Sequence, residues 1–146
     1  EDPMDYFRDI STFGGCTAGP AAAIENMRII EDENLLDNTV AMGDRLLKNF
    51  EALAEKHKVI GEVRGKGLFS GFELVADRQT RAPADEKQCA QIVAECAKRQ
   101  VIIGVTNRSV PGYNNTLTFS PALIATPDHI DEISNAVDES LTAVFG

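Results

Sequence analysis

The sequence predicts an α+β domain in which helices cover one face of a small, mainly antiparallel sheet. Four segments repeat apolar residues at helical spacing, and four short apolar segments lie between them in pairs. Short strands that alternate with helices in this way are typical of an α+β layer. With 146 residues, 43% of them hydrophobic, the chain is long enough to bury one core.

The helices are predicted from their apolar stripes. They cover residues 18–33 (or 20–33), 36–57 and 85–100, and a last helix that begins after Thr126. Thr126 is a good N-cap, and Pro127 suits the first helical position. The residues expected to face the core are Ala23, Met27 and Ile30; Leu36, Val40, Leu47, Phe50, Leu53, Ala54 and His57; Cys89, Ile92, Val93, Cys96 and Ala97; and Ile130, Ile133, Val137, Leu141 and Val144.

The strands are predicted from short apolar runs bounded by turn residues. They cover residues 59–64, 68–75, 101–103 and 116–119. The first two are expected to pair across a turn or bulge at residues 65–67. Residues 77–84 and 107–115 are polar, contain proline, and are expected to be loops.

Charge and cysteine content limit the possible partners. The net charge of −9 disfavours nucleic acid and anionic membranes, and no apolar run is long enough to span a bilayer. Three cysteines are an odd number, and Cys89 and Cys96 are two turns apart on one helix, too far for a bridge. We therefore expect reduced thiols and a cytoplasmic location. His57 and His129 have no partners at metal-ligand spacing.

The most informative segment is residues 11–23, STFGGCTAGPAAA. Two hydroxyls precede two glycines, and a run of small residues then leads into a helix. Glycine allows close approach to the main chain, and hydroxyl and N–H groups near a helix N-terminus are good ligands for phosphate. Cys16, beside the glycines, is interpreted as a small buried residue rather than a reactive one.

From Thr12 onward the chain resembles the C-terminal part of a class III aminotransferase, a pyridoxal-phosphate-dependent enzyme of fold type I. Thr12 to Gly15 match the family pattern, although Cys16 and Thr17 stand where the family usually has Asn-Pro or His-Pro. Residues 26–35, 63–75 and 117–124 resemble later family blocks in the same order. The details resemble the pyruvate-using branch that acts on amines or ω-amino acids, including taurine.

The resemblance implies a division of the chain and a set of site residues. Residues 1–35 would end the large cofactor domain, and residues 36–146 would form the small C-terminal domain with its long connecting helix. Thr12, with weaker help from Ser11, would bind the phosphate of pyridoxal 5'-phosphate held by the neighbouring subunit of a homodimer. Arg108 would bind the substrate carboxylate through its planar guanidinium. Arg64 is expected to pair with a carboxylate near the sheet.

The chain lacks a lysine in a family-like cofactor motif, so both the Schiff-base lysine and the carboxylate beside the pyridine nitrogen are expected upstream of Glu1. The sequence is therefore interpreted as a fragment that is inactive alone. The full enzyme would move an amino group from an amine or ω-amino acid to a keto acid, with pyruvate expected.

Alternatives remain open at this stage. Thr12 can be an ordinary turn or helix cap, and Arg108 can be a solvated loop residue. The full protein can be another class III enzyme, such as an aminomutase or a decarboxylase, because a fold does not fix the chemistry. A non-catalytic α/β binding or regulatory domain is the alternative outside this cofactor class.

Overall fold

The computed structural model describes residues 11–107 and 110–146. The chain divides into two compact units, one ending at Glu33 and the other spanning Asn34–Gly146. Asn34, at the division, takes a left-handed backbone conformation with a φ of 51°, which interrupts the helical path. Within the described residues, no helix is both long and apolar enough to cross a bilayer.

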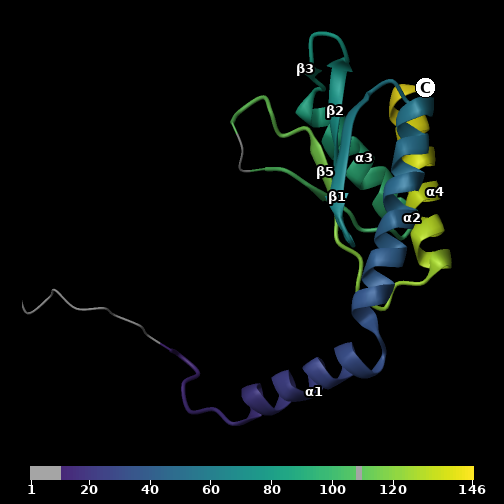
Figure 1. Ribbon diagram of the computed structural model, residues 1–146. Helices are drawn as coiled ribbons and strands as arrows, with labels where there is room; N and C mark the ends of the chain where they lie inside the picture. The colour runs from purple at the N-terminus through teal and green to yellow at the C-terminus, as the bar shows by residue number, and fades with distance from the viewer. Residues whose placement is uncertain (1–10, 108–109) are drawn as a thin grey trace, which may run out of the picture. The chain divides into compact units, whose positions relative to one another are not determined.

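The second unit is a sheet with three helices packed on it (Figure 1). The helices are α2 (Leu35–Lys56), α3 (Glu86–Lys98) and α4 (Pro127–Phe145). The strands are β1 (Ile60–Lys66), β2 (Phe69–Asp77), β3 (Ala82–Pro83), β4 (Gly104–Val105) and β5 (Thr116–Phe119). Their order is β1-β2-β5-β4, with β3 paired to β2, and every pairing is antiparallel. The predicted α+β class is confirmed.

The two faces of the sheet differ because side chains alternate along each strand. Phe72 and Leu74 of β2 and Leu117 of β5 are fully buried in the core that the helices share. Several intervening positions are polar or charged, as at Glu62 and Arg64 of β1, which are exposed. The helices therefore cover the apolar face and leave the charged face uncovered within this unit.

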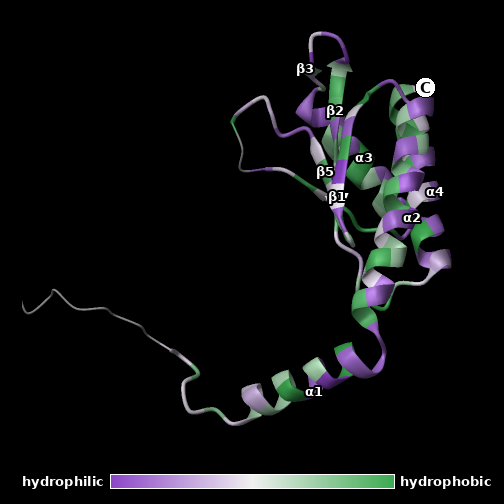
Figure 2. Cartoon of the chain, in the orientation of Figure 1, coloured by the Kyte–Doolittle hydropathy of each residue, from purple (hydrophilic) through white to green (hydrophobic). Residues whose placement is uncertain are grey.

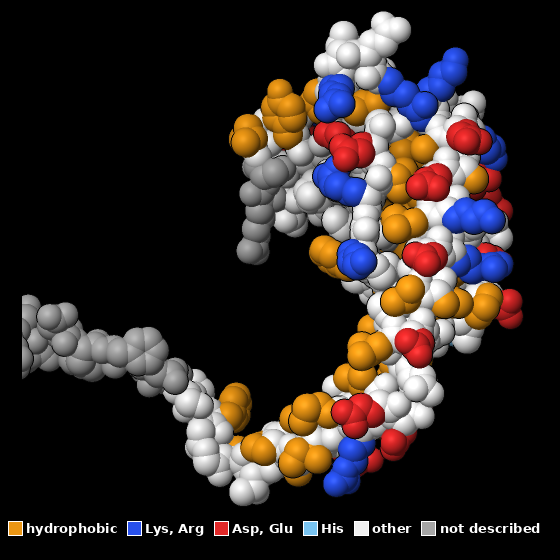
Figure 3. All heavy atoms as spheres, in the orientation of Figure 1, with side chains coloured by type: hydrophobic (Ala, Val, Ile, Leu, Met, Phe, Trp, Pro, Cys, Tyr) orange, Lys and Arg blue, Asp and Glu red, His pale blue; other side chains and the backbone are white. Residues whose placement is uncertain are grey.

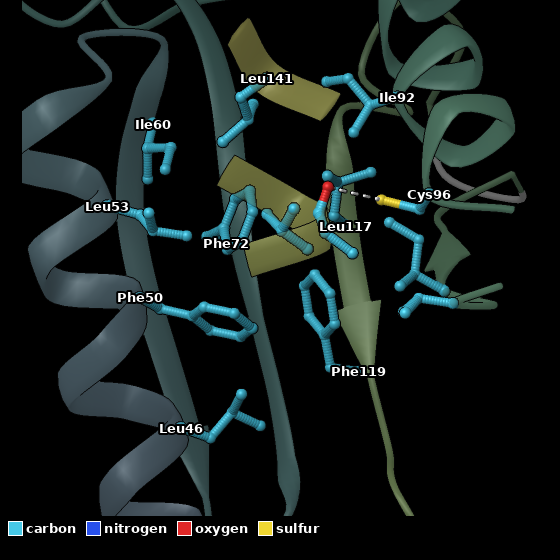
Figure 4. Close-up of a cluster of buried hydrophobic side chains, with 14 of the residues drawn as sticks. Leu46, Phe50, Leu53, Ile60, Phe72, Ile92, Cys96, Leu117, Phe119 and Leu141 are labelled. Atoms are coloured by element: carbon cyan, nitrogen blue, oxygen red, sulfur yellow. Dashed lines mark hydrogen bonds between the residues drawn. The ribbon is translucent and has the colours of Figure 1, made fainter. Parts of the chain in front are cut away.

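Three aromatic rings form the centre of the core (Figure 4). Phe50 of α2 meets Phe72 of β2 edge-on, with ring centroids 5.2 Å apart and planes at 82°. Phe119 of β5 completes the group, with its centroid 4.6 Å from that of Phe50 and 5.4 Å from that of Phe72. Each such contact adds about 0.5–1.5 kcal/mol beyond the area that it buries, so this group fixes α2 on the sheet.

The β1–β2 hairpin turns more tightly than expected. Its strands pair as far as Lys66 and Phe69, so β1 continues through the predicted turn and only Gly67 and Leu68 lie in the loop. Gly67 has a φ of +54°, a conformation that favours glycine. The turn lies against Gly43 of α2, where an added Cβ would be 2.4 Å from the Gly67 carbonyl carbon and oxygen.

Polar contacts join α2 to α4 and close the end of α2. Arg45 donates to both carboxylate oxygens of Asp131, at 2.9 and 2.5 Å. Arg78, between β2 and β3, donates to the carbonyls of Ala54 and His57 at the C-terminal end of α2. These carbonyls have no partner within the helix, so Arg78 acts as its C-terminal cap. At the start of α4, Thr126 and His129 form the predicted cap as a reciprocal pair.

His57, expected on the inward-facing stripe of the second helix, is largely buried at the end of that helix. It is the C-cap of α2, with its side chain only 11% exposed, and its Nε2 lies 2.5 Å from Asp138 Oδ1 of α4. Lys56 donates to the same carboxylate at 2.6 Å. Partial burial alone would raise the pKa of Asp138, but the hydrogen bonds from His57 and Lys56 lower it.

Some predicted core positions are wrong. Leu36 and Val40 are 69% and 59% exposed because the first turns of α2 extend past the end of the sheet (Figure 1), and Ala97 is also exposed. The segment 101–103 is not a strand: Val101 and Ile103 are buried, whereas Ile102 is 93% exposed, and the pairing begins at Gly104. The predicted loop at 77–84 contains the short strand β3, which pairs with β2.

The first unit contains one described helix, α1 (Ala18–Asp32), which has no buried residue. Of the predicted inward stripe, Met27 is 55% exposed, Ala23 is exposed and Ile30 is half-buried, so within this unit the stripe packs on no core. Figure 2 shows hydrophobic positions along this helix, and in Figure 3 their side chains gather along one side of it. An uncovered apolar helix face indicates a surface that other polypeptide covers.

Candidate functional site

The candidate phosphate-binding segment, residues 11–17, is a compact turn that leads into α1. The N–H of Gly14 donates to the carbonyl oxygen of Ser11 at 3.2 Å, and the N–H of Cys16 donates to that of Phe13 at 3.1 Å. Gly15 has a φ of +83° with nothing near its Cβ position, so its backbone is open to a ligand. The two glycines therefore shape a tight turn whose outer side is accessible.

The two predicted ligands differ in their surroundings. A Cβ added at Gly14 would lie 3.2 Å from both the carbonyl and the hydroxyl oxygen of Ser11, so the Ser11 side chain lies against the turn. The Thr12 side chain is exposed, and its hydroxyl makes no hydrogen bond with any other described residue. This favours Thr12 over Ser11 as a donor to an external anion, and nothing in the turn shows the alternative capping role for Thr12.

The start of α1 suits an anion. Its N-cap, Thr17, makes no side-chain capping hydrogen bond, and the first turn contains no acidic residue. The N–H groups of Ala18 and Gly19 therefore stay available, whereas Pro20 has none. Together with the Thr12 hydroxyl, these donors fit a phosphate group by their chemistry. Cys16, predicted to be buried, is exposed beside them.

No lysine of this chain, all of which lie within the described residues, is buried in a site where it could form the covalent link to pyridoxal phosphate. All of the lysines are exposed on helices, at strand ends or in turns: Lys48, Lys56, Lys58, Lys66, Lys87 and Lys98. Cys89 and Cys96 are buried free thiols, and burial raises the pKa of Cys89 to about 11, which disfavours a nucleophilic thiolate. Across residues 11–107 and 110–146, no group of His, Cys, Asp and Glu side chains is arranged to hold a metal ion.

The predicted substrate residue, Arg108, lies outside the described residues. Arg64, expected to pair with a carboxylate near the sheet, has its guanidinium 3.5 Å from a carboxylate oxygen of Glu62 on the same strand. Both side chains are more than half exposed, so this pair contributes little stability. The structural interpretation of Arg64 is therefore supported.

A cavity of about 660 Å³ lies between β2 and the C-terminal end of α4, away from the predicted site residues. Two of its charged side chains, Asp77 and Arg78, have structural roles. Asp77 accepts hydrogen bonds from the backbone and hydroxyl of Thr80 and from the backbone of Gln79, which lower the pKa of its carboxyl group. Arg78 caps α2, and Lys58, which also lines the cavity, is exposed.

One polar contact beside the predicted substrate loop was missed at the level of sequence. Glu86, in the first turn of α3, accepts three hydrogen bonds from Gly112 and Asn114. The only sequence signal is an acidic residue at a helix start, which the helix dipole alone explains. The contact links residues 26 and 28 positions apart, so no local pattern predicts it.

Comparison with known proteins gives one consistent family. The family model described as aminotransferase class III matches residues 2–141. The hypotaurine/taurine–pyruvate aminotransferase of Paracoccus denitrificans is 70% identical over 99% of this chain, and the taurine–pyruvate aminotransferase of Rhodobacter capsulatus is 61% identical over 96%. The chain covers 32% and 30% of these two proteins, so it spans about a third of the length of its relatives.

Solved structures agree with this result. A Bacillus anthracis aminotransferase is 36% identical, with a TM-score of 0.89 over 97% of this chain and 31% of its own. A pyridoxal-phosphate-bound amine transaminase from an uncultivated Pseudomonas species is 30% identical, with a TM-score of 0.83 over 94% of this chain and 30% of its own. The predicted resemblance and the predicted relation to fold-type-I enzymes are confirmed.

Proposed function

The chain belongs to the class III aminotransferase family, and from this premise we propose the function of the full-length protein. It is a pyridoxal-phosphate-dependent enzyme that transfers an amino group from an amine or ω-amino acid to a keto acid, with pyruvate as acceptor. The observation that carries this proposal is the 70% and 61% identity to enzymes named for taurine and pyruvate. The present chain, about a third of such an enzyme and without a suitable lysine, is expected to be inactive alone.

Thr12 is the residue of this chain that we assign to the cofactor. Bound pyridoxal phosphate supplies the electron sink through which an amino group leaves one substrate and joins another. The Thr12 hydroxyl donates a hydrogen bond to a phosphate oxygen, and the N-terminal N–H groups of α1 add to the favourable field. Ser11 has the weaker role, because its side chain lies against Gly14.

The assignment predicts how tightly the full-length enzyme retains its cofactor. A hydrogen bond to a charged group contributes about 1.5–3 kcal/mol, so Thr12→Ala should raise the Kd for pyridoxal phosphate about tenfold or more. Thr17→Ala is a matched control, since its hydroxyl lies in the same segment and caps nothing. Titration of each apoenzyme with pyridoxal phosphate, followed by visible absorbance, measures the Kd of both variants. Equal Kd values for Thr12→Ala and the wild type would contradict the role of Thr12.

We further propose a homodimer in which Thr12 serves the site of the neighbouring subunit. The exposed Thr12 hydroxyl and the uncovered face of α1 support an external partner. Subunit mixing tests this directly. A heterodimer of a Thr12→Ala subunit with a subunit that lacks the cofactor lysine contains one intact site if Thr12 acts across the interface, and none if it acts within its own subunit. Recovery of about half the wild-type activity per dimer is the expected result.

Arg108 remains our proposal for the residue that binds the acidic group of the substrate. Arg108→Ala in the full-length enzyme should raise KM for ω-amino acid donors and for pyruvate, and should leave simple amine donors almost unaffected in the first half-reaction. An equal rise in KM for donors with and without an acidic group would contradict this role.

Donor and acceptor screening tests the reaction itself. With taurine or an ω-amino acid as donor, the full-length enzyme should form alanine from pyruvate, and faster than it forms amino acids from other keto acids. Release of carbon dioxide or internal migration of the amino group would instead show a decarboxylase or an aminomutase. A colourless full-length protein that binds no pyridoxal phosphate would favour the non-catalytic alternative. We retain the cytoplasmic location as part of the proposal.

A further inference from the structure

The cavity of about 660 Å³ between β2 and the C-terminal end of α4 is built entirely from described residues of the second unit. The ends of α2, β2 and α4 lie at the same end of this unit (Figure 1). Backbone hydrogen bonds fix the walls of the cavity. The N–H of Val75 donates to the carbonyl oxygen of Val59 at 2.7 Å, and the N–H of Ala84 donates to that of Leu74 at 3.1 Å. The walls therefore belong to the sheet.

Several of these walls are apolar. Val75 and Ala84 are buried, and Val59 and Phe145 are partly buried against the hydrophobic core. A ligand body that covers these four side chains removes apolar surface from water, which favours binding. The cavity therefore suits a ligand that carries an apolar body.

Two cations line the cavity, and one of them is fixed in place. The Nε of Arg78 donates to the carbonyl oxygen of Ile60 at 2.8 Å, and its Nη2 donates to those of Ala54 and His57. Its Nη1 donates to no residue that the structure describes, so a ligand that binds there leaves the cap of α2 intact. Lys58 is exposed and forms no ion pair with a described residue.

The charge at the cavity favours an anion. Asp77 is the one carboxylate among the lining residues, and the same oxygen already accepts from the N–H groups of Gln79 and Thr80, at 2.9 and 2.7 Å. The two cations of Arg78 and Lys58 therefore exceed the negative charge at this cavity, although the whole chain has a net charge of −9. Figure 3 shows several Lys and Arg side chains at this end of the unit. An ammonium ligand would meet both cations, whereas an anion is attracted by them.

We propose that this cavity binds a small organic carboxylate with an apolar body. The carboxylate lies between the Lys58 ammonium and the Nη1 of Arg78, and the body covers Val75 and Ala84. Such a ligand binds only the folded unit and therefore raises its stability as the ligand concentration rises. The proposal does not depend on the proposed function, because it involves neither the cofactor nor the substrates of the full-length enzyme.

Hexanoate is a suitable probe, and its binding to the 146-residue chain is measured by the shifts of backbone amide signals in NMR spectra. We expect saturable shifts at Val59, Val75 and Ala84, with a Kd on the order of 1 mM. Lys58→Gln should raise this Kd about threefold or more. Since Lys58 bonds to no described residue, this change should not affect folding. Lys48→Gln removes an exposed lysine of α2 that does not line the cavity and is the matched control, with an unchanged Kd.

Related probes separate the two parts of the ligand. Acetate lacks the apolar body and should bind at least about tenfold more weakly than hexanoate. Hexylamine keeps the body but reverses the charge, and should give no saturable shifts at these residues. Inorganic phosphate that binds as tightly as hexanoate would overturn the apolar part of the proposal, and hexylamine that binds as tightly would overturn the anionic part.

Three further results would overturn the site itself. They are the absence of saturable binding of hexanoate, shifts that map outside the residues that line the cavity, and equal Kd values for Lys58→Gln and the wild type. The full-length protein gives the last test. There, isothermal titration with hexanoate should show the same difference between the wild type and Lys58→Gln, and the loss of this difference would show that other polypeptide fills the cavity.

Discussion

Replacing Gly43 by alanine should raise helix propensity but also create a steric clash with the Gly67 backbone, and the size of each effect on stability is known. Gly43 lies in the middle of α2, where alanine is favoured over glycine by about 0.5–1 kcal/mol. The added Cβ, however, would lie 2.4 Å from the carbonyl carbon and oxygen of Gly67 and 2.5 Å from its Cα. All three atoms are backbone atoms of the hairpin turn, so no side-chain rotation relieves the contact.

The cost of the steric contact should exceed the gain in helix propensity. Ordinary contact requires a separation of at least 3.4 Å, so the hairpin and α2 must move apart by about 1 Å. Added methyl groups in a packed core cost typically about 1–3 kcal/mol, and a rigid two-residue turn lies toward the upper end of this range. After the gain in helix propensity is subtracted, we expect Gly43→Ala to lower the free energy of unfolding by about 1–2 kcal/mol.

Urea unfolding of the 146-residue chain, followed by circular dichroism, measures this change. With an m-value of about 2 kcal/mol/M, the midpoint should fall by about 0.5–1 M. Gly19→Ala makes the same chemical change in α1, where nothing lies within 4 Å of the Cβ position, and should not lower the midpoint. A Gly43→Ala variant as stable as the wild type, or more stable, would show that the turn yields freely and that the close contact has no energetic role.

Two further predictions follow from burial and charge. A thiol reagent at about pH 8 should label Cys16 at once, but Cys89 and Cys96 only after unfolding, because burial raises the pKa of both buried thiols; rapid labelling of all three would contradict the packing of α3. Hydrogen bonding from Arg45 lowers the pKa of Asp131 in the folded protein below its unfolded-state value of 3.8. The ion pair therefore stabilises the fold fully above pH 3.8, and this stabilisation is lost as the pH falls through the folded-state pKa. Asp131→Asn should therefore lose less stability than the wild type between about pH 5 and pH 3, as measured by urea unfolding. If its free energy of unfolding falls with pH as steeply as that of the wild type, the pairing of Arg45 with Asp131 is refuted.

Much of the fold is local in origin and could be predicted. The apolar spacing in α3 and α4 is set by residues three and four apart, and the cap at Thr126 involves a partner three residues away. Sequence order likewise brought the hydroxyl–glycine segment next to a helix start, which indicates an anion site, whereas the assignment of Thr12 to a cofactor phosphate came from the resemblance to class III aminotransferases.

The errors and omissions have a common physical cause. Leu36 and Val40 fit the apolar stripe of α2, yet they are exposed, because a periodic pattern does not say how far the sheet extends beneath the helix. Ile102 was placed in a strand by its apolar neighbours, whereas the backbone partners needed for pairing begin only at Gly104. In both cases the burial depends on a neighbour that is distant in sequence.

By itself, the sequence determined the helices and most of the strands, because these depend on residue type and short-range order, and its resemblance to class III aminotransferases indicated the family. Only the tertiary structure decided the contacts between distant residues: His57 with Asp138, Gly43 with Gly67, and Glu86 with the loop before β5. Each of these joins side chains or backbone more than twenty positions apart, and no local pattern records a partner that only the packing of helix on sheet brings within reach.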